Sequence, residues 1–371
     1  MSANQNSIFV GMDVHKAAIN VAVAVRGRRE PEAEWQLANE PRAVTKLIKK
    51  LKEMTHGAVK AAYEAGPCGY ALQREMCEQG IDCIVVAPSL IPVKPGERVK
   101  TDRRDARKLA TMLQAGLLTE VHPPTPEDES VRALTRARED TKQDQMRARH
   151  RLGKMLLRHG FVYRDGGNWT MRHREWLGRV RFGDEISQRV FEGYVLVLEQ
   201  VEERLKAIDG QIAEVAQSER YRERVGWLRC LRGVETVTAM MLLAELHDFR
   251  RFTSPRELMS FLGMTPSEHT SSSRVRRGSI TKAGNTHVRR TLVEAAQHYR
   301  HPPRVNATMR TRRAGQPARV LAIADRAQER LHRRYFKLKE GYRKPHNVAV
   351  VAVARELVGF IWAVLRHSEA A

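Results

Sequence analysis

Two acidic residues, Asp102 and Asp105, lie inside a strongly basic segment, VKTDRRDARKLA (residues 99–110). If this segment begins a helix, positions i and i+3 share one face, so both carboxylates point toward the same place. An exposed helix start explains the same residues, with Thr101 or Asp102 as N-cap and acids in the first turn. On these residues alone, the exposed helix start is the better interpretation.

Two further acids lie at the ends of apolar segments. Asp13 lies at the end of SIFVGMDV, and Glu64 near the end of VKAAYEA, just before a Gly-Pro turn. Acids at strand ends suit a site at the edge of an α/β sheet, but converging carboxylates raise one another's pKa unless a cation intervenes. Taken with Asp102 and Asp105, they predict a site for Mg²⁺ or Mn²⁺, which prefer oxygen ligands and can hold a phosphodiester.

Each acid by itself is explained more simply as a surface or capping residue. Four of them in this order favour the metal site, and the surrounding lysines and arginines would then hold a nucleic-acid backbone. His15, two residues after Asp13, is interpreted as a turn residue or as a group that contacts a ligand of the ion.

The first third of the chain alternates apolar segments with helical patterns. We expect strands at 7–14, 17–25, 32–39, 59–65 and 81–88, and helices at 41–54 and 69–80. A tight turn is expected near His15-Lys16. This order predicts a mixed sheet with helices on its faces, up to about residue 120.

A breaker-rich linker, HPPTPEDES (residues 122–130), precedes a long basic helical stretch, and residues 160–183 are irregular. A heptad seam follows, formed by Leu198, Val201, Leu205, Ile208, Ile212 and Val215. We interpret 127–217 as a coiled-coil or helical arm for oligomerisation, in which the two long helices form an antiparallel hairpin or a coiled coil with a partner. A helical bundle inside one domain is the alternative.

The last part of the chain, 220–371, is expected to be mostly helical. Helical runs around Gly233 are interpreted as a helix-hairpin-helix-like element that offers backbone N–H groups to a phosphate, with an ordinary helix turn as the alternative. Ser254 is the expected N-cap of a short helix. Residues 265–285 are interpreted as a polar loop, and the apolar residues 347–365 as a helix that closes the core.

The composition indicates a polyanionic partner. The chain has 371 residues, enough for two or three domains, with 65 Lys and Arg against 43 Asp and Glu and a net charge of +22. No apolar run looks long enough to cross a bilayer, and the N-terminus lacks the pattern of a signal peptide. The four cysteines form no CxxC pair. We expect a reduced, cytoplasmic protein that associates with the nucleoid and has no membrane partner.

The motifs FVGMDVHK, YEAG and KTDRRDARKLA resemble the RuvC-like DEDD domain of bridge-RNA-guided insertion-sequence transposases. LRGVETVTAMMLLAEL and LMSFLGMTPSEHTSSSRVRRGSITKAGNTHVRRTLVEAA resemble the C-terminal serine transposase domain of the same proteins. The resemblance implies an α/β RNase H/RuvC-like domain (1–122), a coiled-coil segment (127–217) and a mostly α C-terminal domain (220–371).

The resemblance also implies the site residues. The acidic tetrad is Asp13, Glu64, Asp102 and Asp105. The nucleophile is Ser271, with Ser272 as second choice because it stands where these proteins usually have glycine. The basic residues expected to bind nucleic acid are Lys100, Arg103, Arg104, Arg274, Arg276, Arg277 and Lys282.

The implied function is a DNA recombinase that moves its own insertion sequence, guided by a structured non-coding RNA and acting as a dimer or tetramer. Its composite site would join the Mg²⁺-bound tetrad of one subunit to the serine of another. Two alternatives stay open: a RuvC-like metal-dependent junction nuclease without serine chemistry, which needs only the N-terminal motifs, and a non-catalytic nucleic-acid-binding protein. The RNA is implied by the resemblance alone.

Overall fold

The computed structural model describes residues 7–28, 30–92, 101–268 and 276–366. It divides into two compact units, Met1–Pro124 and Thr125–Ala371, which are described separately below. Lys100, Ser271, Ser272 and Arg274 lie outside the described residues, and only the backbone of Arg277 is described. The sequence-based division set a further boundary near residue 217, but the structure holds both sides of it in one compact unit.

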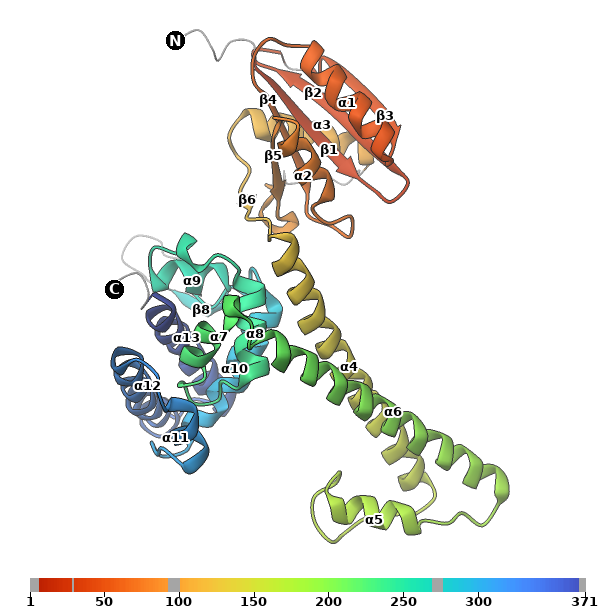
Figure 1. Cartoon of the computed structure of the whole chain (residues 1–371), viewed down its shortest axis with the longest axis vertical. Coiled ribbons are helices and arrows are strands. Elements are labelled where there is room, and N and C mark those ends of the chain that lie inside the picture. The colour runs from red at the N-terminus through yellow and green to blue at the C-terminus, as the bar shows by residue number, and fades with distance from the viewer. Residues whose placement is uncertain (1–6, 29, 93–100, 269–275, 367–371) are drawn as a thin grey trace. The chain divides into compact units, whose positions relative to one another are not determined.

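Unit 1 is built on a mixed sheet of six strands (Figure 1) in the order β3-β2-β1-β4-β5-β6. The strands are β1 (Ile8–Val14), β2 (Ala18–Val25), β3 (Ala33–Ala38), β4 (Val59–Glu64), β5 (Asp82–Val86) and β6 (Glu120–Val121). Strand β1 runs parallel to β4, and β4 to β5, while the other pairs are antiparallel. The predicted strands and mixed sheet are confirmed, and β6 was missed because two residues carry no pattern.

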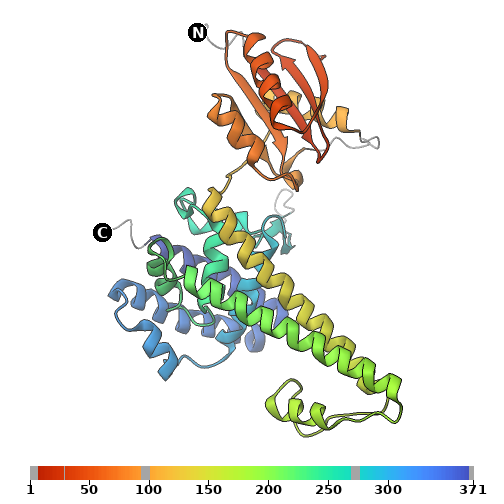
Figure 2. The same ribbon diagram turned by 45° about the vertical axis from the view of Figure 1, so that its right-hand side comes forward.

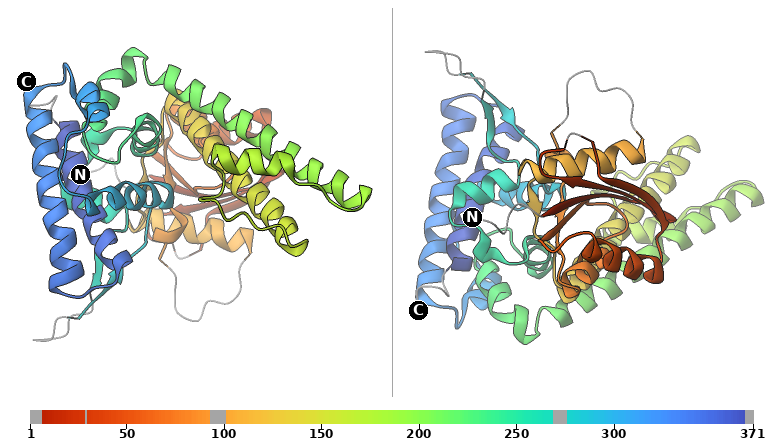
Figure 3. Two further views of the ribbon diagram at one scale, coloured as in Figure 1. Left: turned by 90° about the horizontal axis from the view of Figure 1, so that it is seen from below. Right: turned by 90° about the horizontal axis from the view of Figure 1, so that it is seen from above.

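Helices cover both faces of this sheet (Figure 3). They are α1 (Pro41–Glu53), α2 (Ala71–Glu78), the short η1 (Pro88–Leu90) and α3 (Asp102–Gln114). Successive side chains of a strand point to opposite faces. Ile8, Val10 and Met12 of β1 therefore pack in a core with α1 and α2, while Phe9 packs on the other face against α3.

Gly11 allows α3 to lie directly on β1. A Cβ atom at this position would stand 2.1 Å from the carbonyl oxygen of Ala106 and 2.3 Å from the amide nitrogen of Ala110. Thr101 is the N-cap of α3, since its hydroxyl accepts a hydrogen bond from the Arg104 amide at 3.4 Å. The close contact and the cap together bring the first turn of α3 to the end of β1.

The arm of unit 2 consists of α4 (Pro126–Arg158) and α6 (Glu185–Val215), which lie side by side (Figure 2). The predicted linker was partly wrong: Thr125 caps α4, and Pro126 occupies the first helical position, where its missing N–H has no cost. Leu205 and Ile212 of the heptad seam are buried within the chain. A coiled coil between subunits stays a prediction.

Ion pairs and a small aromatic core complete the arm. Arg138 Nε donates to Asp209 Oδ1 at 2.9 Å, linking α4 to α6. The segment expected to be irregular contains α5 (Met171–Arg179), whose Trp176 packs with the ring of His173. Leu177 belongs to the same apolar cluster as the facing ends of α4 and α6.

Helices surround one large apolar core in the rest of unit 2. Its elements are α7 (Glu219–Leu228), α8 (Thr236–Leu246), η2 (Phe249–Arg251), α9 (Pro255–Phe261), β7 (Pro266–Glu268), β8 (Arg277–Ile280), α10 (Thr286–Ala296), η3 (Gln297–Arg300), α11 (Ala307–Arg313), α12 (Ala318–Phe336), η4 (Lys337–Gly341) and α13 (His346–Leu365). The predicted cap at Ser254 and the predicted helix at 347–365 are confirmed.

Helix α13 corrects one sequence-based expectation. By length and composition it could cross a membrane, so the statement that no apolar run is long enough was wrong. Half of its apolar window is buried inside the unit, where Val353, Leu357 and Ile361 belong to the core. The same apolarity is therefore explained by packing.

The turn at Gly233 also has a packing explanation. Its φ is +79°, and a Cβ atom there would stand 2.5 Å from the carbonyl oxygen of Ala295 at the end of α10. A glycine is thus required for α7 and α8 to turn against α10. A helix-hairpin-helix element that binds phosphate stays a prediction.

Candidate active site

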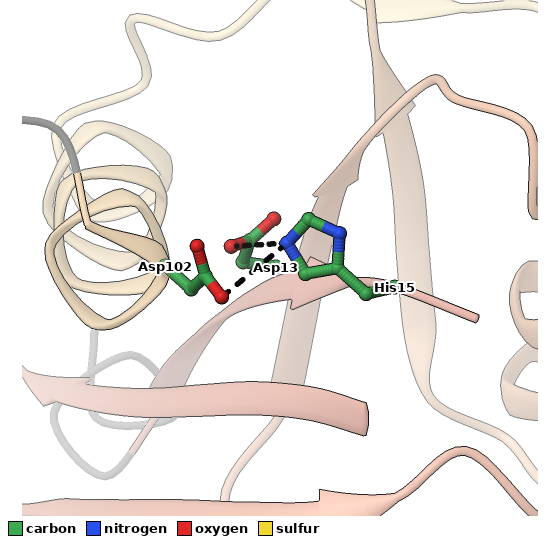
Figure 4. A group of neighbouring side chains, drawn as sticks. All are labelled: Asp13, His15 and Asp102. Atoms are coloured by element: carbon green, nitrogen blue, oxygen red, sulfur yellow. Dashed lines mark hydrogen bonds and ion pairs between the residues drawn. The ribbon is translucent and has the colours of Figure 1, made fainter. Parts of the chain in front are cut away.

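The structure brings together three side chains from β1, the turn after it and α3. The ligand atoms of Asp13, His15 and Asp102 all lie within 4.8 Å of one another (Figure 4). His15 Nε2 lies 3.1 Å from Asp13 Oδ2 and 3.6 Å from Asp102 Oδ2. Asp13 shares a face of β1 with Gly11, which faces α3, so strand alternation and the helix start place the two carboxylates together.

Backbone hydrogen bonds fix the turn that carries His15. The His15 amide donates to the carbonyl oxygen of Ala18 at 2.9 Å. Asn39, just after β3, donates from Nδ2 to the His15 carbonyl oxygen at 2.8 Å and from its amide to Ala17 at 3.1 Å. The imidazole is therefore attached to a turn that is held on both sides, and the sequence analysis placed it outside the ligand set.

Glu64 lines the same pocket but does not join the close group. The pocket has a volume of about 540 Å³ and includes Asp13, His15, Asn39 and Glu64. Asp105 also lies outside the close group, although it is near enough to act on the charge of Asp13. Among the residues that the structure describes, two of the four predicted acids, Asp13 and Asp102, are thus brought into ligand distance.

Burial raises the pKa of Asp13, whose side chain is 17% exposed. The neighbouring His15 lowers this pKa, while the charges of Asp102 and Asp105 raise it further. The ionised site therefore carries an electrostatic cost that a cation would offset. Carboxylate oxygens and an imidazole nitrogen are donors that divalent ions accept, so the residues present fit such an ion.

The basic residues of α3 are partly engaged within unit 1. Arg103 and Arg107 pair with Glu34 of β3, and Arg107 Nη2 donates to Glu34 Oε2 at 2.8 Å. The hydrogen bond from Arg107, and then that from Arg103, outweigh burial and lower the pKa of Glu34 to about 2. The Arg103 side chain remains 68% exposed, and Arg104 is exposed beside it.

In unit 2, the segment expected to be a polar loop contains the two-stranded hairpin of β7 and β8, so that expectation was wrong for these residues. Two glycines allow close backbone contacts at its base. A Cβ atom on Gly263 would stand 1.9 Å from the Ala283 carbonyl oxygen, and a Cβ atom on Gly284 would stand 1.9 Å from the Phe261 carbonyl oxygen. Arg276 is exposed at the start of β8.

Lys282 follows β8 in a left-handed conformation, with φ +58°. Its amide donates to the Gly263 carbonyl oxygen at 3.0 Å, and its side chain is exposed. Such a conformation in a non-glycine residue persists only where the surroundings enforce it. The exposed Lys282 is therefore presented from a fixed backbone.

A buried carboxylate supports the same segment. Glu245 of α8, with a side chain 1% exposed, accepts hydrogen bonds from Arg136 Nε at 2.7 Å and from Asn285 Nδ2 at 2.6 Å. Asn285 is also the N-cap of α10. Sequence reasoning missed this network because Glu245 and Arg136 are 109 residues apart.

The mixed sheet, with acids at the ends of β1 and β4 and at the start of α3, is consistent with an RNase H-like fold. Two family models match the chain: the DEDD transposase model of IS110 elements over residues 10–161, and the transposase IS116/IS110/IS902 family over residues 227–311.

Relatives that match along most of this chain are also named as transposases. The Sinorhizobium fredii protein y4qE, named as a transposase, is 39% identical over 368 residues, covering 99% of this chain and 90% of that protein. The transposase for insertion sequence element IS1533 of Leptospira borgpetersenii is 37% identical, covering 92% of this chain and 99% of its own length. The transposase for IS1111A of Coxiella burnetii is 23% identical over 80% of this chain and 74% of its own length.

The chain therefore belongs to the IS110 family of insertion-sequence transposases. It is a DNA transposase, an enzyme that recombines DNA strands, so the sequence-based prediction of this activity is confirmed at the level of the family.

Proposed function

We propose that this transposase cuts and rejoins the DNA of its own insertion sequence with a divalent ion held by Asp13, Glu64, Asp102 and Asp105 and with Ser271 as nucleophile. The observation that carries the proposal is that the ligand atoms of Asp13, His15 and Asp102 all lie within 4.8 Å of one another. Glu64 lines the same pocket as Asp13 and His15.

The acids would hold Mg²⁺ or Mn²⁺ at the ends of β1 and β4. Bound there, the ion would stabilise negative charge on the oxygens of the phosphodiester. Asp13 contributes a rigid strand-end carboxylate, whereas Asp102 is 61% exposed and open to the approach of a DNA backbone. The close packing of α3 on β1 keeps the two carboxylates near each other.

In the proposed strand transfer, the serine hydroxyl oxygen attacks the scissile phosphorus. A bond between this oxygen and phosphorus forms, the bond to one deoxyribose oxygen breaks, and the serine proton passes to solvent while the released oxygen takes a proton from water. Reversal of the step with another strand end rejoins the DNA and restores the serine. A serine hydroxyl needs activation and a polarised phosphate for this chemistry.

The basic residues would hold the DNA backbone around this centre. Those proposed are Lys100, Arg103, Arg104, Arg274, Arg276, Arg277 and Lys282. Contacts from lysine and arginine to phosphate release counterions, so the dissociation constant should rise steeply with salt concentration. A binding isotherm that hardly changes between 50 and 200 mM salt would contradict these contacts.

Guidance by a non-coding RNA and assembly into dimers or tetramers rest on the resemblance of the motifs. The test is purification of the full chain from cells that carry the complete element, followed by sequencing of bound RNA and a mass measurement in solution. A structured RNA from the element's flank is expected in the complex. Random cellular RNA, removed by salt without effect on recombination, would contradict guidance.

The serine proposal is tested with Ser271→Ala, Ser272→Ala and the double variant, with Ser279→Ala on β8 as the matched control. A protein-linked DNA strand should form with wild type and Ser279→Ala, and be lost with the variant that removes the nucleophile. Full cleavage and rejoining by the double variant would overturn the serine chemistry.

A metal-dependent junction nuclease is the second candidate, because all described acids of the site belong to unit 1 and are independent of the serine segment. It predicts that the double serine variant still hydrolyses a four-way junction, without a protein–DNA link.

A further inference from the structure

We propose that His15 is itself a metal ligand of this site, so that the ion is bound by an imidazole nitrogen as well as by carboxylate oxygens. This inference rests on the proposed metal site and deepens it. It assigns to His15 a direct role in selecting the ion, in addition to the four acids carried over from the family motifs.

The distances around His15 are those expected of neighbouring ligands. In an octahedral site with bonds of about 2.1 Å, adjacent ligand atoms lie about 3 Å apart. His15 Nε2 is 3.1 Å from Asp13 Oδ2 and 3.6 Å from Asp102 Oδ2. One ion can therefore contact all three atoms with only small movements of the side chains (Figure 4).

The surroundings keep the imidazole at this place. The turn that carries it is held by Ala18 on one side and by Asn39 on the other, at 2.9 and 2.8 Å. The His15 side chain is 54% exposed, so an ion can reach Nε2 from the pocket that it lines. Its Nε2 faces both carboxylates, at 3.1 Å from Asp13 Oδ2 and 3.6 Å from Asp102 Oδ2.

A nitrogen ligand changes which ions the site prefers. Imidazole is a good ligand for borderline transition metals, whereas Mg²⁺ takes oxygen ligands almost exclusively. With His15 in place, the site is expected to bind Mn²⁺ more tightly than Mg²⁺. Removal of the imidazole should lower the affinity for Mn²⁺ by about tenfold, the lower range for loss of a group that tunes a metal site. The affinity for Mg²⁺ should change by less than about threefold.

The experiment uses Mn²⁺ as the probe and needs no DNA or activity. Binding to the full-length protein is followed by the electron paramagnetic resonance signal of free Mn²⁺, with Mg²⁺ measured by competition. Electron spin-echo modulation then reports whether a ¹⁴N nucleus coordinates the bound Mn²⁺. The variants are His15→Ala, His15→Asn and, as a matched control, His56→Ala on an exposed loop of the same unit.

The expected result is ¹⁴N modulation in wild type and His56→Ala, and its loss in both His15 variants together with the tenfold drop in Mn²⁺ affinity. If Mn²⁺ binds to the wild-type protein without ¹⁴N modulation, the inference is overturned. This result does not depend on any variant. So would unchanged affinity and modulation in a folded His15→Asn protein.

Failure of this inference is distinguishable from failure of the proposed function. If Asp13→Asn abolishes Mn²⁺ binding while His15→Ala does not alter it, the carboxylate site stands and His15 is only a hydrogen-bonding neighbour of Asp13. If Asp13→Asn leaves Mn²⁺ binding unchanged, the proposed metal site itself is wrong.

Discussion

The two regions to which we assign chemistry are built in different ways. In unit 1, Asp13, Glu64 and Asp102 stand at the ends of regular elements, and their positions follow from strand alternation and a helix cap. In unit 2, the hairpin that flanks the serine segment is held by backbone contacts at Gly263 and Gly284 and by buried Glu245. The acidic site therefore tolerates little change in packing, while the hairpin depends on a few long-range polar contacts.

The largest effect is expected from Asp13→Asn, which removes a carboxylate from the proposed ion site. Strand cleavage should fall by about 10³-fold, the scale for losing a group that stabilises transition-state charge. The matched control is Asp82→Asn, whose carboxylate on β5 pairs with Lys60 at 3.5 Å and should not matter. Strand cleavage by Asp13→Asn at the wild-type rate would contradict the proposed role of the acidic site.

The same variant has a predicted effect on pH dependence. Because the pKa of Asp13 is raised on folding, the folded protein binds this proton more tightly than the unfolded chain does. Without metal, the ionised carboxylate therefore destabilises the fold at neutral pH, and this penalty fades as pH falls through the raised pKa. Metal-free Asp13→Asn should melt at a higher temperature than wild type at pH 7, which thermal unfolding measures.

Glu245→Ala tests the support of the hairpin in unit 2. It would leave Arg136 and Asn285 without their buried acceptor, and we expect a loss of about 3 kcal/mol in the free energy of unfolding. The control is Glu294→Ala on α10, where an exposed pair with Arg290 should contribute less than about 0.5 kcal/mol. Equal stability of the two variants in denaturant titrations would show that the network does not hold the segment.

Glu245 also predicts an acid dependence. Burial alone would raise its pKa, but the hydrogen bonds from Arg136 and Asn285 outweigh burial and lower it. Its contribution is therefore complete above the pKa of the unfolded chain and is lost as pH falls through the lower folded value. In Glu245→Ala, the free energy of unfolding should therefore fall less steeply with decreasing pH than in wild type.

Gly11→Ala tests the packing of α3 on β1. The added methyl would meet the backbone at Ala106 and Ala110, so α3 must shift, at a cost of about 1–3 kcal/mol. A shift of about 1 Å in α3 would move Asp102 from Asp13 and reduce cleavage by about 10²-fold. Gly210→Ala in α6, where a Cβ atom meets nothing within 4 Å, should instead raise stability by about 0.5–1 kcal/mol.

The smallest effect is expected from Glu34→Gln, which releases Arg103 and Arg107 from β3. Arg103 is exposed and Arg107 is half-buried, so solvent screens the pairs in part and the loss at pH 7 should be about 0.5–1 kcal/mol. In wild type this contribution disappears as pH falls from about 4.5 to about 2. Urea titrations of both proteins at pH 7 and pH 3 measure this contribution. A difference in the free energy of unfolding between wild type and Glu34→Gln that is larger at pH 3 than at pH 7 would contradict the stabilising role of these ion pairs.

Sequence reasoning located the regular parts of the acidic site because local patterns specify them. Asp13 and Glu64 end apolar runs, and Thr101 precedes a helix as its cap. It did not count His15 among the ligands, because the position of the imidazole beside Asp13 and Asp102 depends on a turn that Asn39, 24 residues away, helps to fix.

The hairpin of unit 2 could not be predicted for a related reason. Strands β7 and β8 have three and four residues and almost no large apolar side chains. The two strands are held in place by contacts of Gly263 with Ala283 and of Gly284 with Phe261, which no local sequence pattern reveals. The start of α4 was missed because Pro126 was interpreted as a breaker, when a proline also suits a first helical position.

Anomalous scattering from crystals of the full-length protein soaked in Mn²⁺ tests the proposed ion site most directly. We expect a peak between Asp13 and Asp102, within ligand distance of both, and its loss in Asp13→Asn crystals. Well-diffracting wild-type crystals with no peak at that place would contradict it.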